Sequence, residues 1–379
     1  MRYQKYTVDD VRKAASRKRF TVISCFAGGG GSSIGYRLAG CNVLLINEFV
    51  QSAIDTYSAN FPETPVLVED IKDLTAEDFL SKANLKKGEL DIMDGSPPCS
   101  AFSTSGKRDK GWGQDKVYSD GKIQNSIEEL FLEYIRIIEG VRPKVIVAEN
   151  VKAITYGKSD AKKREFVRAF ENLGYGMVPK VLNGADFGVP QKRERAIFVG
   201  VRDDVLEKTN WQWINMNLVF PSPTTPKHIT VGDALEDVVN DETEVKMLLE
   251  FVEGSYQKKF IEMLPKNPKK VLNPGLPQFL DVNPKGSCFN MKRCSQYLPA
   301  PTLTQQGQKM GLSGVMHFNE NRKLTIKECK RIMSFPDDYV LTGTFDQQAE
   351  RLGRAVAPRM YEQLMNSIYD HILKEYNNA

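Results

Sequence analysis

Cys99 has the setting of a nucleophile. It follows Pro97 and Pro98, just after an apolar segment at 90–93 that predicts a strand. Proline fixes φ and donates no backbone N–H, so the loop carrying this thiol is stiff and cannot continue a β-ladder. A thiol on a loop has the exposure that nucleophilic attack requires. The alternative is a small buried cysteine, and further motifs are needed to decide.

Two further segments place ionisable side chains at the ends of predicted strands. Glu149 follows a strand predicted at 145–148, where it is a candidate proton donor or an acid at a helix N-terminus. Arg193 and Arg195 precede a strand predicted at 196–201. Alternation along an extended segment would send both guanidiniums to one side, which suits a carbonyl or phosphate ligand. A solvated run of charge is the alternative.

A glycine-rich segment, Phe26 to Ser32, follows the strand predicted at 21–26. Glycines allow a tight turn and close approach of the backbone to a ligand. No lysine precedes Ser32, which excludes a P-loop, and the G-x-G-x-x-G spacing of dinucleotide sites fails at Ser33 or Ile34. NAD chemistry is therefore disfavoured.

Two acids follow the next two predicted strands, at 43–46 and 66–68. Glu48 lies about twenty residues after the glycines, where a carboxylate would bind ribose hydroxyls. Asp70 could meet an adenine amino group. A glycine loop and two acids in this order fit S-adenosylmethionine, an adenosine cofactor without a pyrophosphate; isolated surface acids are the alternative.

The elements that must position these residues alternate between strand and helix up to residue 202. Helices are predicted at 32–39 and from Asn125 or Ser126 to Gly140. This alternation predicts an α/β fold with a doubly wound, mostly parallel sheet, in which ligands gather at the carboxyl ends of the strands. Residues 203 to about 300 are proline-rich with little periodicity and predict a second, irregular domain. Helices return at 324–333 and 361–376.

Composition narrows the class of protein. The 379 residues carry a net charge of +4, too small to identify a nucleic-acid partner by itself. Six dispersed cysteines without C-x-x-C, and only three histidines, predict neither a zinc site nor disulfides. We expect a reduced, metal-free, cytoplasmic protein with neither a secretory signal nor a membrane span.

The motifs, in order, resemble the DNA cytosine-5 methyltransferase family. Phe26-Ala27-Gly28, Glu48, Pro97-Pro98-Cys99, Glu149-Asn150-Val151 and Gln191-x-Arg193-x-Arg195 carry the resemblance. It continues through 301–304, 322–325, 328–329, 335–337 and 352–356, leaving out only 203–290. Amino-directed DNA methyltransferases have an aromatic ring after Pro-Pro, where this chain has Cys99.

The resemblance implies a bacterial or phage modification enzyme of the restriction-modification type. It would transfer a methyl group from S-adenosylmethionine to carbon 5 of a cytosine flipped out of a specific double-stranded DNA sequence. Cys99 would add to carbon 6, Glu149 would bond the N3 and amino edge, and Arg195, helped by Arg193, would hold O2. A catalytic and cofactor-binding domain is expected at 1–202 plus 322–379, and a smaller, irregular target recognition domain at 203–321.

The resemblance also implies contacts with cofactor and DNA. The expected cofactor-binding residues are Phe26, Gly28, Gly30, Glu48, Asp70, Ile71, Pro98, Arg354 and Ala355. The expected DNA-binding residues are Ser103, Lys107, Arg108, Lys110 and Gln306. The first four of these lie in a basic, glycine-rich segment, 103–120, expected to close over the flipped base as a mobile loop.

Arg354 departs from the family pattern, which usually has Asn there. A guanidinium beside a sulfonium is repulsive unless an anion lies between them. Arg354 could point to solvent, pair with the ordinary donor's carboxylate, or accept carboxy-S-adenosylmethionine, which would make the product a carboxymethylcytosine.

Two rival functions are an RNA cytosine-5 methyltransferase and a non-enzymatic reader. A reader would be expected to lose Cys99, Glu149 or Arg195, and all three are present. A monomer is expected.

Overall fold

A computed structural model describes residues 2–97, 116–117, 123–124, 129–155, 160–209, 211, 213–255, 258–267, 292–304 and 315–378. The chain divides into two compact units. The sheet unit comprises Asp9–Leu182, Glu194–Ser222 and Tyr361–Ala379, and the helical unit comprises Met1–Val8, Asn183–Arg193 and Pro223–Met360. These bounds differ from the two domains expected from the sequence, so the functional division between catalysis and target recognition stays a prediction.

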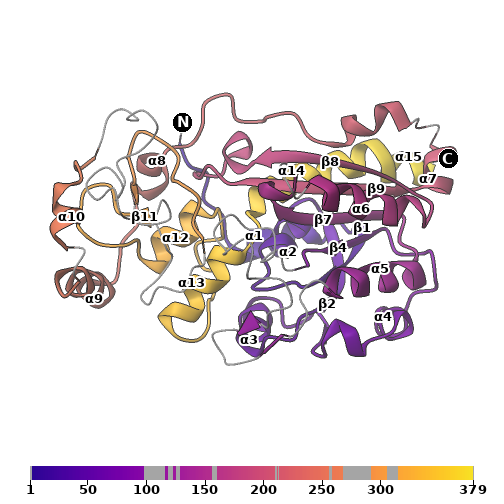
Figure 1. The fold of residues 1–379 in the computed structure, drawn as a ribbon, viewed down its shortest axis with the longest axis horizontal. Coiled ribbons are helices and arrows are strands. Elements are labelled where there is room, and N and C mark those ends of the chain that lie inside the picture. The colour runs from indigo at the N-terminus through magenta and orange to yellow at the C-terminus, as the bar shows by residue number, and fades with distance from the viewer. Residues whose placement is uncertain are drawn as a thin grey trace. The chain divides into compact units, whose positions relative to one another are not determined.

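A seven-stranded sheet forms the centre of the sheet unit, in the order β3-β2-β1-β4-β7-β9-β8 (Figure 1). The strands are β1 Phe20–Cys25, β2 Cys41–Asn47, β3 Val66–Leu67, β4 Ile92–Gly95, β7 Val145–Val151, β8 Tyr175–Asn183 and β9 Glu194–Arg202. The pairs from β3 to β7 are parallel, and β9 is antiparallel to β7. The order reverses at β1 and β4, so the carboxyl ends of these two strands are the expected place for a ligand.

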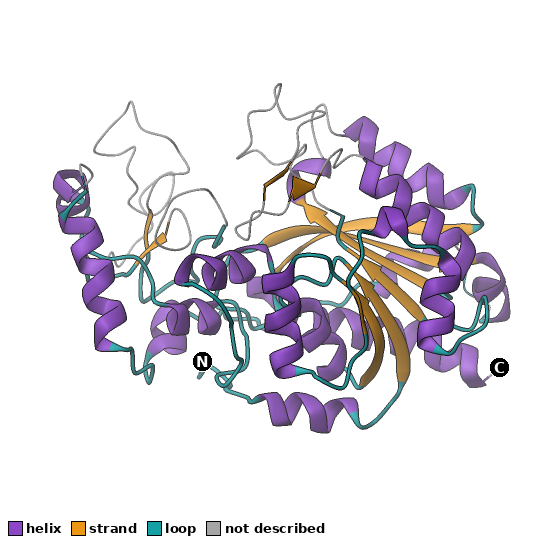
Figure 2. Ribbon diagram, turned by 90° about the horizontal axis from the view of Figure 1, so that it is seen from below, coloured by secondary structure: helices purple, strands orange, loops and turns teal. Residues whose placement is uncertain are grey.

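Helices cover both faces of this sheet (Figure 2). Those of the sheet unit are α1 Val8–Ala15, α2 Gly31–Leu38, α3 Gln51–Asn60, α4 Ala76–Ala83, α5 Glu129–Val141, α6 Asp160–Glu171, α7 Asp203–Lys208, α14 Pro358–Ile368 and α15 Lys374–Asn378. Val8 of α1 and the first three residues of α14 belong to the helical unit. None of the helices in the described ranges has the length and apolar character needed to cross a bilayer.

The helical unit contains α8 Val231–Leu235, α9 Glu242–Glu253, α10 Lys258–Met263, α12 Ile326–Ile332 and α13 Phe345–Arg354. Short strand pairs join β10 Lys292–Arg293 to β11 Val315–Met316, and, in the sheet unit, β5 Lys116–Val117 to β6 Ile123–Gln124. The sequence predicted an irregular segment from 203 to about 300, and α9 shows that this was wrong for part of it. Asp241 caps the first turn of α9, and Leu248 and Val252 are buried.

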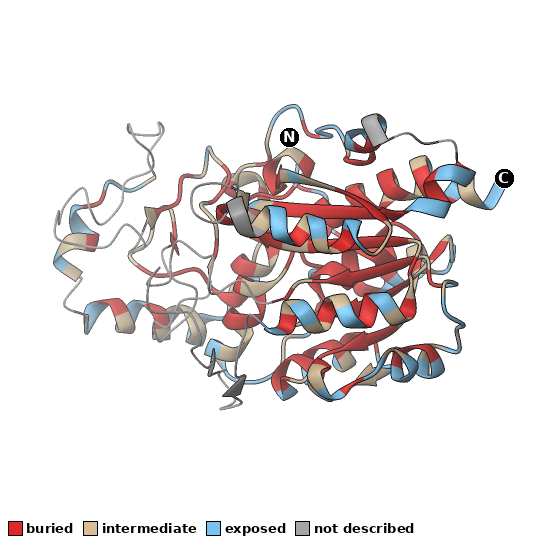
Figure 3. Cartoon of the chain, turned by 45° about the vertical axis from the view of Figure 1, so that its right-hand side comes forward, coloured by how far each residue is buried: buried red, intermediate tan, exposed pale blue. Residues whose placement is uncertain are grey.

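One large core packs α4, α5 and α6 against the sheet. Alternate residues of the strands, such as Cys25 of β1 and Met93 of β4, face this core, and the rings of Phe131 and Phe166 stack at 4.5 Å. The strands are buried almost throughout, whereas the covering helices alternate buried and exposed residues (Figure 3). This striping is what a period of 3.6 residues produces in a helix that packs through one face.

Four thiols in the described part of the chain are buried: Cys25, Cys41, Cys294 and Cys329. Burial raises the pKa of each, because the thiolate would lose its hydration. These cysteines are therefore packing residues.

Gly140 of α5 is expected to tolerate no side chain. A Cβ there would lie 2.2 Å from the Cβ of Ala76 at the start of α4. Gly140→Ala should lower the free energy of unfolding by roughly 1–3 kcal/mol through overpacking. Adding Ala76→Gly should recover part of that loss, whereas Gly254→Ala, with 3.5 Å to its nearest neighbour, should be tolerated. Urea denaturation of the four proteins measures this, and equal stability of Gly140→Ala and wild type would contradict it.

Candidate active site

The glycine loop turns the chain sharply between β1 and α2. Phe26 and Gly28 have φ of 56° and 54°, and Gly30, the N-cap of α2, has φ of 84°. Left-handed φ is unfavourable for a residue with a side chain, so Phe26 holds a strained conformation of the kind found at ligand sites. The strain sits where the sequence predicted a cofactor-binding loop.

Glu48, just past the end of β2, is tied to this loop by backbone hydrogen bonds. Gly28 N donates to Oε2 at 2.8 Å, and Phe49 N and Val50 N each donate to Oε1 at 2.9 Å. The carboxylate thus links the glycine loop to the start of α3. An ionised carboxylate has about four acceptor sites, so Oε2 can also accept a hydrogen bond from a ligand hydroxyl.

Asp70 and Ile71 follow the neighbouring strand, β3. The carboxylate of Asp70 accepts a hydrogen bond from Lys72 N at 3.2 Å and caps a short 3₁₀-helix, Ile71–Asp73, in which Ile71 is buried. Because β2 and β3 are parallel neighbours, Glu48 and Asp70 lie at the same edge of the sheet. Two acids at adjacent strand ends beside a glycine loop fit an adenosine group.

Glu149 and Arg195 form an ion pair across β7 and β9. Arg195 Nε lies 2.8 Å from Glu149 Oε1, and the two side chains are 12% and 13% exposed. The antiparallel register sets Val151 opposite Arg195, so the guanidinium reaches diagonally to Glu149 on the same face of the sheet. The sequence identified both residues as candidates for catalysis but did not show that they are partners.

Arg193 lies in different surroundings. Its buried guanidinium donates to the carbonyls of Leu303 at 2.9 Å, Gly353 at 3.0 Å and Ala355 at 2.7 Å. These bonds hold three segments of the helical unit together. Strand β9 begins at Glu194, so the alternation argument that set both guanidiniums on one side does not extend to Arg193. Its help in catalysis stays a prediction.

Asp94 is a buried acid that sequence reasoning missed. It is the third residue of β4, directly opposite Ser24 of β1, whose Oγ donates to Asp94 Oδ2 at 2.8 Å. Burial raises the pKa of Asp94 to about 7; the nearby charge of Glu149 also raises it, and hydrogen bonds, including the one from Ser24, oppose the rise. A carboxyl group directly after the apolar segment 90–93 was the available signal.

Arg354 pairs within its own helix. Its Nη2 lies 2.5 Å from Oε1 of Glu350, one turn earlier in α13, and Glu350 also lies 3.3 Å from Arg351. The positive charge of Arg354 is therefore compensated by a residue of the protein. The sequence analysis did not consider this partner, although a spacing of four residues on a helix favours it.

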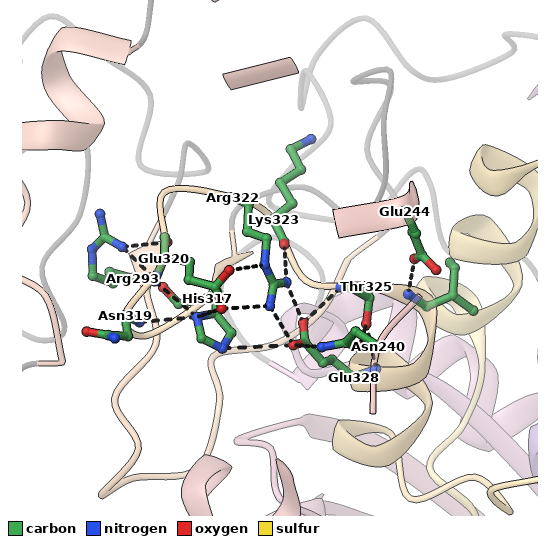
Figure 4. A network of polar contacts seen from close by, with 11 residues as sticks. Asn240, Glu244, Arg293, His317, Asn319, Glu320, Arg322, Lys323, Thr325 and Glu328 are labelled. Atoms are coloured by element: carbon green, nitrogen blue, oxygen red, sulfur yellow. Dashed lines mark hydrogen bonds and ion pairs between the residues drawn. The ribbon is translucent and has the colours of Figure 1, made fainter. Parts of the chain in front are cut away.

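A polar network holds the helical unit together (Figure 4). Arg322 donates to both carboxylate oxygens of Glu328 at 2.8 Å, and Asn240 donates to Glu328 at the same distance. Burial alone would raise the pKa of Glu328, but the hydrogen bonds and charge of Arg322 outweigh it and the pKa is lowered. Glu244 of α9 accepts a hydrogen bond from Ile326 N at 2.7 Å. The motifs at 322–325 and 328–329 therefore serve this network.

Several predicted site residues lie outside the described residues: Pro98, Cys99, Ser103, Lys107, Arg108, Lys110 and Gln306. Their roles stay predictions. Within the described ranges, no group of three or more His, Cys, Asp or Glu side chains is arranged to hold a metal ion.

Comparison with known proteins identifies the family. The model of the C-5 cytosine-specific DNA methylases matches residues 20–370, nearly the whole chain. The chain belongs to this family. It is therefore a DNA cytosine-5 methyltransferase, as the resemblance implied.

Curated relatives agree with this assignment. Type II methyltransferase M1.HphI of Haemophilus parahaemolyticus is 30% identical over 352 residues, which cover 92% of this chain and 86% of that protein. M.Eco47II of Escherichia coli is 29% identical over 372 residues, covering 96% and 81%. The chain is thus related over most of its length to bacterial modification enzymes.

Solved structures share the fold. A prophage-encoded protein of Escherichia coli, described as a DNA modification methyltransferase, has a TM-score of 0.65 at 20% identity, covering 94% of this chain and 99% of that one. A DNMT2 variant of Spodoptera frugiperda has a TM-score of 0.60 at 18% identity, covering 92% and 99%. The predicted doubly wound methyltransferase fold is confirmed.

Replacing Glu48 by Gln should weaken cofactor binding. The amide keeps one acceptor oxygen but sets an N–H₂ group against a backbone N–H of Gly28, Phe49 or Val50. Loss of one charge-assisted hydrogen bond predicts a roughly tenfold or larger rise in the dissociation constant of S-adenosylmethionine. Calorimetric titration measures it, with Asp55→Asn on the exposed face of α3 as control. Unchanged affinity in Glu48→Gln would rule out this role.

Proposed function

We propose that this methyltransferase acts on a cytosine flipped out of a specific double-stranded DNA sequence, through a covalent adduct of Cys99. The observation that carries the proposal is the Glu149–Arg195 pair. Glu149 belongs to β7, the neighbour of β4, and the last residue of β4, Gly95, precedes Cys99 by four positions in the sequence.

Cys99 supplies the nucleophile. Carbon 5 of cytosine is a poor nucleophile, and addition of a thiolate to carbon 6 turns the ring into an enamine-like species whose carbon 5 can attack an electrophilic methyl group. After transfer, loss of the proton on carbon 5 and elimination of the thiolate restore the aromatic base. Because the ring face is inaccessible in a duplex, the base must first leave the stack, at a cost of a few kcal/mol.

When cytosine binds, Glu149 and Arg195 separate, and each forms hydrogen bonds with the base instead. Without DNA, the two neutralise one another at 2.8 Å. With cytosine bound, Arg195 donates to O2, where negative charge develops when the thiolate adds. Glu149 accepts from the amino group and donates to N3. Because N3 is a hydrogen-bond acceptor, Glu149 must carry a proton at that moment.

The residues present fit S-adenosylmethionine. Glu48 retains acceptor capacity for ribose hydroxyls, Asp70 is available to an adenine amino group, and the strained turn at Phe26 to Gly30 presents backbone to the methionine part. When bound, the cofactor supplies a methyl group on a sulfonium. Cofactor contacts by Pro98, Arg354 and Ala355 are proposed from the family resemblance alone.

DNA contacts are proposed for Ser103, Lys107, Arg108, Lys110 and Gln306. Basic side chains that neutralise phosphate would make binding salt-dependent. Since the relatives are named type II methyltransferases, we propose a role in a restriction-modification system, as a monomer acting on DNA inside the cell.

The carboxymethyl alternative is disfavoured by Arg354. Its guanidinium already has an anionic partner in Glu350, so its presence does not call for a further carboxylate on the donor. The RNA alternative is tested in the next experiment, which compares DNA with RNA as the substrate.

Cys99→Ala is expected to abolish product formation. Nucleoside mass spectrometry of unmodified DNA incubated with S-adenosylmethionine should show 5-methylcytosine with wild type and none with the variant, because the adduct at carbon 6 cannot form. Cys329→Ala, which removes a buried packing thiol, serves as control and should retain activity. Methylation of RNA and not of DNA would favour the RNA alternative, and full activity of Cys99→Ala would exclude the covalent mechanism.

Arg354→Asn should leave the donor preference unchanged. Wild type and variant are offered S-adenosylmethionine and carboxy-S-adenosylmethionine separately, and the modified cytosines are quantified. We expect 5-methylcytosine from both proteins, because Arg354 already has an anionic partner in Glu350. A carboxymethylcytosine that wild type forms and the variant does not would instead establish the carboxylated donor.

A further inference from the structure

A row of polar side chains crosses one face of the sheet. Ser24 of β1 lies opposite Asp94 of β4, and Asp94 lies opposite Val147 of β7. Glu149 is two residues beyond Val147 and shares its face, as does Arg195 opposite Val151. Four neighbouring strands therefore contribute Ser24, Asp94, Glu149 and Arg195 to the same face of the sheet.

Two tyrosines close this face over Asp94. Tyr36 of α2 and Tyr361 of α14 are fully buried, with ring centroids 5.7 Å apart. Among the described residues, neither hydroxyl has a well-directed hydrogen-bond partner, and nor does Asp94 Oδ1. Tyr36 nevertheless interacts with Asp94, and Tyr361 lies within electrostatic reach of both Asp94 and Glu149. Asp94 is thus sealed from water, beside Glu149.

Within this enclosure, Asp94 and Glu149 are the acids that can change charge. The other titratable groups that interact electrostatically with Asp94 are Tyr36 of α2 and Tyr361 of α14, on its own side of the sheet, and Cys25 of β1 and Tyr134 of α5, in the core on the opposite side. Burial raises the pKa of each well above its ordinary value, so all four stay neutral. Arg195 is the cation on the other side of Glu149. Glu149 therefore sits between a permanent cation and a carboxyl group that titrates near neutral pH.

We propose that Asp94 is a positioning residue that controls the protonation of Glu149 while cytosine is bound. This rests on the proposed role of Glu149 as donor to N3. In the ligand-free enzyme Glu149 is paired with Arg195. Once Arg195 turns to O2, an ionised Asp94 disfavours a second negative charge on Glu149 and so favours its protonated form. Glu149 takes one proton from solvent on binding and returns it when the Arg195 pair re-forms.

The pH dependence of the chemical step tests this. Asp94→Asn keeps the shape of the side chain and can accept the hydrogen bond from Ser24, but it never carries charge. Above neutral pH, Glu149 would then lose its proton more readily. The alkaline limb of the single-turnover rate should move to lower pH by roughly 0.5–1 unit, while the KM for S-adenosylmethionine stays unchanged.

Asp91→Asn is the matched control. Asp91 lies just before the other end of β4 and pairs with Lys144 at 2.7 Å, away from the polar row. Its replacement should lower stability without moving the alkaline limb. An alkaline limb of Asp94→Asn that coincides with that of wild type would overturn the proposal.

A second measurement does not need a folded Asp94 variant. The carboxyl carbon of Asp94 is followed by NMR in ¹³C-aspartate-labelled protein from pH 5 to 9. The charge of Glu149 raises the pKa of Asp94, so the titration midpoint should fall in Glu149→Gln, by roughly 0.3 unit or more. An unmoved midpoint in an inactive Glu149→Gln would refute the coupling alone. A moved midpoint in a fully active Glu149→Gln would refute the proposed role of Glu149, and this inference with it.

Discussion

The parallel pairing of β1 with β4 is the constraint on which the site depends. The strand order reverses there, and in sheets of this kind ligands bind at the carboxyl ends of the two strands where the order reverses. Strand β1 continues into the strained glycine turn, and β4 ends four residues before Cys99 in the sequence. The hydrogen bond from Ser24 to Asp94 joins the pair one residue before both strands end. The segments proposed to bind the cofactor and to carry the nucleophile therefore both follow from this strand pair.

Three acidic side chains near the carboxyl ends of these strands lie in three different surroundings. The carboxylate of Glu48 accepts hydrogen bonds from three backbone N–H groups, Glu149 pairs with the guanidinium of Arg195, and burial raises the pKa of Asp94 to about 7. Desolvation makes a buried ion pair weak evidence for stability, because its formation often gains little over an apolar pair. The Glu149–Arg195 pair is therefore better explained by the hydrogen bonds that its two side chains could make with a bound base than by its contribution to the stability of the fold.

Six of the seven strands of the sheet, the fold class and the placement of Glu149 and Arg195 at strand ends could be predicted from sequence, because strand periodicity and strand ends are local properties; β8 was not predicted. The burial of Asp94 could not, since it depends on Tyr36 and Tyr361, which come from α2 and α14. The alternation argument did not extend to Arg193, because β9 begins one residue later, at Glu194. Helix α9 was not predicted, because it lies in a proline-rich part of the sequence. Its N-cap Asp241 and its buried Leu248 are nevertheless residues typical of a helix that packs through one face.

The number of hydrogen bonds already made within the protein distinguishes Arg193 and Arg322 from the Glu149–Arg195 pair. Arg193 commits its guanidinium to three carbonyls, and Arg322 donates to the carboxylates of Glu328 and Glu320, each within the helical unit. A base that displaced such bonds would leave buried carbonyls or carboxylates unpaired, at about 1–3 kcal/mol each. Arg195 and Glu149 differ: in the proposed mechanism, separating them to bind cytosine replaces one charge-assisted contact by two or three with the base. The contact that we propose between Arg195 and O2 would strengthen as negative charge develops on the ring, which is the condition for stabilising a transition state rather than a substrate.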